Sequence, residues 1–154
     1  MTPYDLAQRF VGITELKVRG MDHPLIQWAL SLCGFPSDVP DETPWCSAFV
    51  NMVAWCLRLP RSKSAAARSW LTVGVPVRLA EAFVGSDVVV LKRGGPNEPG
   101  PDVLNARGHV GFYAGREGDY ILVLGGNQGD SVSIARFDVT QLLGIRRLGA
   151  MGVA

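Results

Sequence analysis

The sequence predicts an α+β fold in which N-terminal helices pack on an antiparallel β-sheet. Up to about residue 71, apolar residues recur every three or four positions, which is typical of amphipathic helices. From Asp87 onward, β-branched and alternating runs indicate strands. Two of these runs are joined by a short glycine-containing segment, which favours a hairpin and therefore antiparallel pairing. With 154 residues, 47% of them hydrophobic, the chain is expected to form one domain, residues 1–154, around a sizeable core.

The first two helices are expected before residue 34. The first runs from about Pro3 to Val11 and ends at Gly12, because its apolar residues form one stripe and glycine favours a helix end. The second runs from Leu25 to Cys33, with Asp22 or His23 as its N-terminal cap.

The third helix is expected to begin in the stretch TPWCSAFV. Thr43 is a good N-cap, and Pro44 suits the first helical position because its missing N–H has no helical partner there. Apolar residues from Phe49 to Leu57 recur at helical spacing and predict that one face is buried. A short fourth helix of strong helix formers is expected from Ser64 to Leu71.

The strands follow in the second half of the chain. The clearest runs are residues 87–91, 109–114 and 120–124, and two further strands are expected at 132–137 and 144–148. The segment from Arg93 to Gly108 has no periodicity and is rich in glycine and proline. Loops of this length are often lids or binding loops.

Composition and charge exclude several classes of partner. The formal net charge of +1 creates no general field for nucleic acid or an anionic membrane surface, and no basic stripe suggests otherwise. No apolar run approaches the length of a membrane span, so no stable membrane insertion is expected. Residues Met1 to Asp5 lack the pattern of a signal peptide, so we expect synthesis in a cytoplasm, where thiols stay reduced.

Cys46 is the cysteine placed for chemistry. It falls in the first turn of the third helix, where the helix dipole and free N–H groups favour a thiolate and lower a cysteine pKa. A thiolate there could act as a nucleophile. The alternative is that Cys46 is a small buried hydrophobic residue, which is the role expected of Cys33 and Cys56.

His109 is the candidate base for this nucleophile. It opens a strand after the long loop, and alternation places His109, Gly111 and Tyr113 on one face. With a turn near Gly118, Asn127 lies opposite His109 and can orient its ring. A slip of one residue would turn Asn127 to the other face.

Other interpretations of these positions remain open. The further candidate orienting residues are Gln128, Asp130 and Glu117. Asn127 is also a common turn residue, and His109 could be a half-buried histidine without a catalytic role.

No metal site or cofactor is expected. The three cysteines are too far apart in sequence for the tight ligand pair of a zinc site. The acidic connector with Asp38, Asp41 and Glu42 leads into the third helix and is expected to line the cleft at Cys46. Its spacing does not follow a calcium loop, which favours solvated surface carboxylates.

Several stretches of the chain resemble the small peptidoglycan cysteine hydrolases of bacteria and their phages. These enzymes belong to the CHAP (cysteine, histidine-dependent amidohydrolase/peptidase) and NlpC-type groups of the papain-like superfamily. The matching stretches, in chain order, are DETPWCSAFVN, SAAARSWLTVG, VVVLKRG, GHVGFYAG and LGGNQGDSVSIARF. The resemblance extends from about Leu6 to Arg147 and implies a single papain-like domain.

The resemblance implies a thiol mechanism. Cys46 is then the nucleophile, His109 the base and Asn127 the residue that orients the imidazole. The Cys46 N–H and a donor from the loop 41–43 would stabilise the oxyanion. The residues expected to contact substrate are Trp45, Asp41, Glu42, Trp70 and Tyr113. Arg68 or Arg93 could pair with a substrate carboxylate, the alternative being a solvated surface arginine.

The expected substrate is the peptide part of peptidoglycan, cleaved by a monomer without a cofactor. Cleavage within or between stem peptides is favoured over cleavage by an N-acetylmuramoyl-L-alanine amidase, which is the alternative. A phage endolysin released through a holin, a virion-associated hydrolase and a secreted amidase effector all fit this chemistry. The rivals are acyl transfer by the same residues and an inert interaction domain with the same fold.

Overall fold

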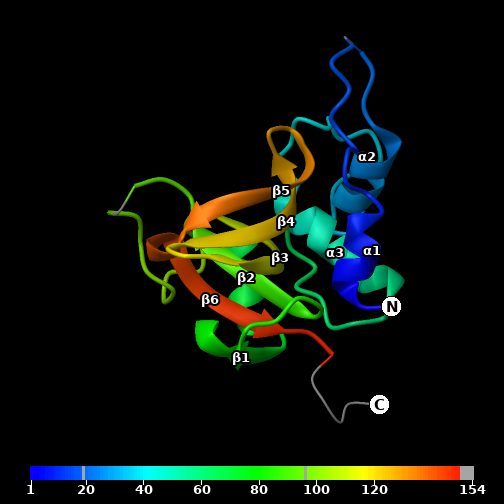
Figure 1. Ribbon diagram of the computed structural model, residues 1–154. Helices are drawn as coiled ribbons and strands as arrows, with labels where there is room; N and C mark the ends of the chain where they lie inside the picture. The colour runs from blue at the N-terminus through cyan, green and yellow to red at the C-terminus, as the bar shows by residue number, and fades with distance from the viewer. Residues whose placement is uncertain (19, 96, 150–154) are drawn as a thin grey trace.

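The computed structural model describes residues 1–18, 20–95 and 97–149 (Figure 1). The three α-helices are α1 (Pro3–Gln8), α2 (Pro24–Ser31) and α3 (Cys46–Cys56). Short 3₁₀ helices are η1 (Ala67–Thr72), η2 (Leu79–Glu81) and η3 (Val139–Gln141). The strands are β1 (Val75–Val77), β2 (Asp87–Lys92), β3 (Gly108–Glu117), β4 (Tyr120–Gln128), β5 (Ser131–Asp138) and β6 (Leu142–Arg147).

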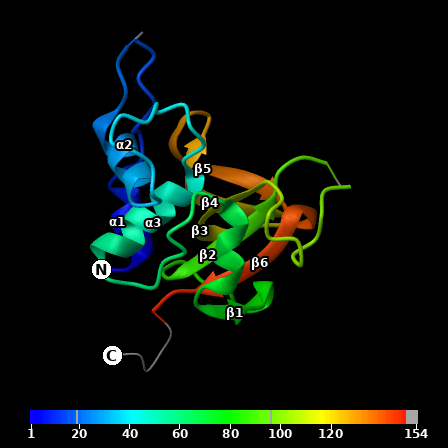
Figure 2. The ribbon, with the colours of Figure 1, turned by 180° about the vertical axis from the view of Figure 1, so that it is seen from behind.

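The predicted α+β fold is confirmed. The six strands form one antiparallel sheet in the order β1-β6-β2-β3-β4-β5. The α-helices gather on one side of this sheet, as the front and back views show (Figures 1 and 2). None of the helices in the described part of the chain is long and apolar enough to span a lipid bilayer.

The helices differ from the predicted ones mainly at their ends. Thr2 and Asp5 form a capping box that starts α1, and the helix ends at Gln8, short of the predicted Val11. His23 caps α2, as predicted, through a hydrogen bond from the Leu25 N–H to its Nδ1. The predicted fourth helix is the 3₁₀ helix η1, which starts later than Ser64 because the Ser64 side chain binds the Ala66 N–H.

The sheet has an apolar core on each face. The helix-side core joins α3 to β3 and β4, where the Phe49 and Phe112 rings meet edge to face with centroids 6.4 Å apart. The opposite face carries a smaller cluster that includes Val89, Leu91 and Val123. Because consecutive residues of a strand alternate between these faces, the apolar run from Val88 to Leu91 in β2 is buried on both sides.

The N-terminal segment covers the edge of β5. Gly12 donates a backbone hydrogen bond to the Val132 carbonyl, Val132 donates back to Ile13, and Glu15 donates to Asp130. Thr14 forms a β-bridge with Ser131. The start of the chain is thereby paired with a strand that follows much later in the sequence, and the exposed edge is shortened.

A buried polar network fixes the far side of α3. Ser47 accepts from the Trp70 indole N–H at 2.9 Å and donates to the Ser64 carbonyl at 2.6 Å. Asn51 lies one turn later, donates to the Ser47 carbonyl and accepts from the Lys63 N–H at 2.9 Å. Each of these buried groups has a hydrogen-bond partner, so the network fixes the rotation of α3 about its axis relative to the segment 63–70.

Two glycines of β4 let the start of α3 approach the sheet. A β-carbon on Gly126 would lie 2.5 Å from the Trp45 ring and 2.9 Å from Cβ of Phe49. A β-carbon on Gly125 would lie 2.6 Å from Oε1 of Gln128 and 3.5 Å from Nε2 of His109. Only glycine therefore fits between α3 and β4 at this point.

Replacing Gly126 by alanine is expected to destabilise the protein by roughly 1–3 kcal/mol, because the methyl group overpacks the contact with Trp45. Urea unfolding measures the effect. Gly100→Ala is the matched control, since a methyl group at that position would have no neighbour within 4 Å and its φ is not in the left-handed region. Equal stability of the two variants would contradict this account of the helix–sheet contact.

Candidate active site

Cys46 is the first residue of α3 and lies against the backbone of β3. The residue before it, Trp45, is the N-cap and makes no side-chain capping bond, so the predicted cap at Thr43 is wrong. The backbone N–H groups of Val110, Ser47 and Cys46 itself act to lower the pKa of the Cys46 thiol. Val110 directly follows His109 in β3, so the thiol and the imidazole come from adjacent parts of the fold.

Burial sets the charge state of Cys46. Its side chain is 4% exposed, and this burial raises the pKa of the thiol above its usual value. The backbone N–H groups and the positive charge of Arg93 oppose the rise in the Cys46 pKa but are smaller than the burial effect. The prediction that the pKa of Cys46 is lowered is therefore wrong. The resting group is a thiol, because desolvation raises the pKa by more than the helix N-terminus lowers it.

His109 is held by Gln128. Its Nε2 lies 2.9 Å from Oε1 of Gln128. The Gln128 amide nitrogen donates to the carbonyls of Val123 and Ser133 at 3.2 and 2.8 Å, and carbonyls only accept. This fixes the amide orientation, so Oε1 faces the ring, Nε2 carries the imidazole proton and Nδ1 carries the lone pair.

A β-bulge explains why Gln128 replaces Asn127 in this role. The register of the β3–β4 hairpin does place Asn127 across from His109 when the pairing of Phe112 with Leu124 is extended by three residues. The β4–β5 pairing is irregular between Gly125 and Gln128, and Asn127 has φ of +59°. The extra residue turns Asn127 off the imidazole and brings Gln128 onto it.

The rest of the imidazole is enclosed. The Phe137 ring stacks on it with centroids 5.2 Å apart, and the side chain of His109 is 3% exposed. Burial is the main reason that the pKa of His109 falls from 6.5 to about 4; the Gln128 hydrogen bond acts against the fall and the Arg93 charge adds to it. His109 is therefore neutral at pH 7 and can accept a proton.

A cleft opens beside His109. Its volume is about 450 Å³. Its walls are formed by residues from β2, β3, β4 and β5 and the segments next to them: Lys92, Arg93, Gly94, His109, Asn127, Gln128, Gly129, Ser133, Ala135, Arg136, Phe137 and Gln141. Asn127 therefore belongs to the wall of the cleft, and a substrate can reach the imidazole from this side.

Most of the other expected contact residues have structural partners. Trp45 is buried and donates from its indole to Glu15 at 2.8 Å, and Trp70 is buried against Ser47. Tyr113 is 7% exposed and packs in the smaller core. Neither indole is free to contact a substrate, because each aromatic body fills the core and its N–H is already paired.

Asp41 also has a structural role, while Glu42 is exposed. The Asp41 carboxylate is buried and accepts from the backbone N–H groups of Leu16 and His23 at 2.9 and 2.8 Å. The N–H of Asp41 donates to Asp22, and that of Thr43 donates to Pro40. Neither N–H is available for an oxyanion, so the expected donor from the loop 41–43 is not found at these two residues.

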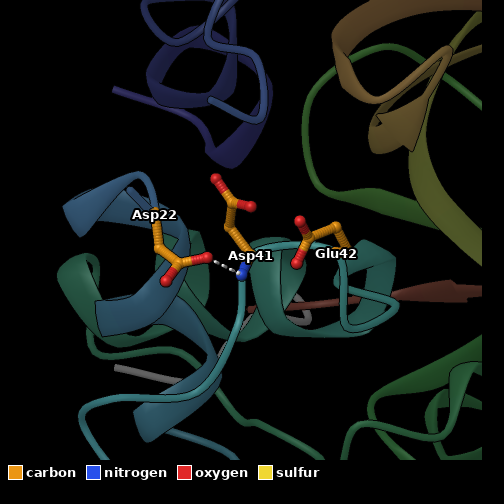
Figure 3. Close-up of side chains that lie close together, drawn as sticks. All are labelled: Asp22, Asp41 and Glu42. Carbon is orange, nitrogen blue, oxygen red and sulfur yellow. Dashed lines mark hydrogen bonds between the residues drawn. The ribbon is translucent and has the colours of Figure 1, made fainter. Parts of the chain in front are cut away.

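Among the described residues, Asp22, Asp41 and Glu42 form a group that could hold a metal ion. Each offers a carboxylate oxygen, and these atoms lie within 4.8 Å of one another. Figure 3 shows the three carboxylates around the segment that leads into α3, with Asp22 bonded to the Asp41 backbone. Oxygen ligands of this kind suit hard cations such as Ca²⁺.

Arg68 and Cys56 lie in surroundings other than those predicted, whereas Cys33 packs against the core as expected. The buried Arg68 guanidinium donates to the carbonyls of Arg107, Gly100 and Val103, so it anchors the long loop and does not face substrate. Cys33 is partly buried beside the helix-side core, and Cys56 is exposed at the end of α3. The prediction of a core position for Cys56 is wrong, because the helix turns this residue to its outer face.

The candidate site contains two neutral groups, the Cys46 thiol and the His109 imidazole. Among the described residues, no hydrogen bond joins Cys46 to His109, but catalytic hydrogen bonds often tighten only when substrate binds. A neutral imidazole whose Nδ1 carries the lone pair, and a thiol at the N-terminus of a helix, can together transfer a proton as the sulfur attacks.

Comparisons with known proteins add one structural likeness. No protein-family model and no curated protein matches the chain. Among solved structures, the chain is similar to NlpC1 from Trichomonas vaginalis, at 16% sequence identity and a TM-score of 0.47. The match covers 96% of this chain and 44% of that one, so the chain spans less than half of the structure that it resembles.

Acid is expected to destabilise the protein through His109. The unfolded chain takes up this proton near pH 6.5, but the folded protein does so only near pH 4, so stability falls as the pH drops between these values. The loss amounts to roughly 3 kcal/mol for this one group. Denaturant midpoints are measured from pH 7 to pH 4, and their decrease with falling pH should be smaller in His109→Gln than in the unmodified protein. The chain's other histidine provides the control variant His23→Gln, and an unchanged slope in His109→Gln would contradict the assignment.

Proposed function

We propose that the protein is a cysteine hydrolase that cleaves an amide bond in the peptide part of peptidoglycan. The observation that carries the proposal is the site itself: Cys46 at the start of α3 lies on the backbone next to His109, whose tautomer is fixed by Gln128. The motif resemblance to the CHAP and NlpC-type hydrolases supplies the substrate class. A papain-like domain and action at the cell wall, as an endolysin or virion-associated hydrolase, belong to the same proposal.

In the proposed first step, Sγ of Cys46 attacks the carbonyl carbon of the amide. The thiol proton moves to Nδ1 of His109 as the carbon–sulfur bond forms, and the Gln128 carbonyl stabilises the resulting imidazolium through the Nε2 proton. The N–H of Cys46 lies at the start of α3, where negative charge develops, and it stabilises the oxyanion.

The remaining steps return the residues to their resting state. The imidazolium gives its Nδ1 proton to the leaving amine, the carbon–nitrogen bond breaks, and an acyl-enzyme is left on Cys46. Water then attacks the thioester while Nδ1 takes its proton. The acid product leaves, and the thiol and neutral imidazole are restored. This sequence needs no thiolate in the resting protein, which agrees with the raised pKa of Cys46.

Cys46→Ala is expected to abolish the release of peptide fragments from purified Gram-negative peptidoglycan, because the nucleophile is lost. Mass spectrometry of the digests checks this and identifies the bond, which separates an endopeptidase from an N-acetylmuramoyl-L-alanine amidase. Cys56→Ala is the matched control, since this cysteine is exposed and belongs to no site described above. Absence of fragments with the unmodified protein, or their persistence with Cys46→Ala, would overturn the proposal.

A second pair of variants tests the orienting residue. Gln128→Ala is expected to lower kcat/KM by roughly a hundredfold, because the imidazole loses the group that fixes its tautomer and stabilises its charge. Asn127→Gly removes only the side chain, because glycine also tolerates the φ of +59° at this position. The decrease in kcat/KM should therefore be much smaller than in Gln128→Ala. A larger loss in Asn127→Gly than in Gln128→Ala would assign the role to Asn127 after all.

A further inference from the structure

Arg93 lies on the basic nitrogen of His109. Its Nη2 is 3.4 Å from Nδ1 of the imidazole, and its Nε donates to the Gly108 carbonyl at 3.3 Å. Since Nε2 carries the imidazole proton, Nδ1 has the lone pair, and the guanidinium can only donate. In the proposed reaction Nδ1 of His109 accepts the thiol proton, but in the free protein the Arg93 guanidinium already contacts this nitrogen.

The side chains that line the cleft around Arg93 favour a negatively charged ligand. Three cationic side chains line it, those of Lys92, Arg93 and Arg136, and no carboxylate does. Within residues 1–18, 20–95 and 97–149, none of the three cations has an ion-pair partner. Three other arginines do form ion pairs: Arg78 with Glu81, Arg107 with Glu98 and Arg147 with Asp87.

We propose that Arg93 binds a carboxylate of the substrate and thereby uncovers His109. The inference rests on the proposed hydrolase function and specifies its substrate: a peptide with a free carboxylate close to the amide that is cleaved. A carboxylate entering the cleft offers the guanidinium a charged, bidentate partner, which is stronger than its contact with a neutral imidazole. The guanidinium moves to this partner, and Nδ1 becomes free to accept the Cys46 proton.

The same exchange alters the electrostatics of the base. The positive charge of Arg93 helps to keep the pKa of His109 low in the free protein. Once a carboxylate neutralises that charge, protonation of the imidazole becomes easier, so the base is stronger when substrate is present. Arg93 acts through His109 and the substrate and is a positioning and specificity residue, whereas the bond changes stay on Cys46 and His109.

The first test compares two synthetic stem peptides that differ only in the D-glutamyl residue, which bears either a free α-carboxylate or an α-carboxamide. The unmodified protein is expected to show at least a tenfold higher kcat/KM for the carboxylate peptide. Arg93→Gln should abolish this preference, and Arg93→Lys, which keeps the charge but not the planar fork, should restore it only in part. Cleavage of both peptides at equal rates by the unmodified protein would overturn the inference and leave the hydrolase proposal standing.

The second test does not need turnover. NMR titration of the His109 ring nitrogens in Cys46→Ala measures the imidazole pKa with either peptide bound. The carboxylate peptide should raise the pKa by about one unit and the carboxamide peptide should not, and Cys46→Ala/Arg93→Gln should show no such difference. Arg136→Gln in the same background is the matched control, because Arg136 lines the cleft without touching the imidazole: binding should weaken, but the pKa of the free protein should stay unchanged.

The two tests separate the possible failures. A shift in the pKa of His109 without cleavage of either peptide by the unmodified protein would retain Arg93 as the carboxylate site and reject the hydrolase. Cleavage without a carboxylate-dependent pKa shift would reject the coupling through Arg93. A shift that persists in Cys46→Ala/Arg93→Gln would assign the carboxylate to another cation of the cleft and overturn the inference.

Discussion

The close contact between the start of α3 and strand β4 is the constraint on which the site depends. Gly126 lets the Trp45 ring and Phe49 reach the sheet, and Gly125 leaves room for the bond between Gln128 and His109. Cys46 is the first residue of the same helix, so the position of α3 also sets the surroundings of its thiol. The glycine pair and the residues that follow it therefore position both side chains of the candidate site: Gly126 lets the start of α3 with Cys46 approach the sheet, and Gln128 holds His109.

Burial then determines how the site can work. Cys46 and His109 are both nearly inaccessible, and desolvation raises the pKa of one and lowers that of the other. Each pKa shift favours the neutral form of its group, so Cys46 and His109 do not form a thiolate–imidazolium ion pair at rest. In the proposed reaction, charge develops on these groups only when a substrate is present, and the dipoles of the helix start and of the Gln128 amide are already oriented toward it.

Much of this could be predicted from the sequence, but only where the signal is local. The helical spacing after Cys46, the period-two runs and the glycine-bounded hairpin indicated the α+β fold and the neighbourhood of Cys46 and His109. The bulge that exchanges Asn127 for Gln128 depends on how β5 pairs with β4, which no short stretch of sequence specifies. The burial of Trp70 and Arg68 likewise follows from contacts with distant segments, and an amphipathic side chain looks the same in sequence whether it lines a cleft or anchors a loop.

The pairing of residues 12–15 with β5 has a consequence for the order of assembly. These residues are synthesised early, yet their partners in the sheet emerge only after the whole hairpin of β3 and β4. Contacts between such distant segments form late, because the loop between them must close first. The thiol of Cys46 is likewise synthesised long before the strands that bury it. A nascent chain that stops short of β3 therefore carries a Cys46 without the strands that bury it, and the surroundings that raise its pKa form only after β3 and β4 have emerged.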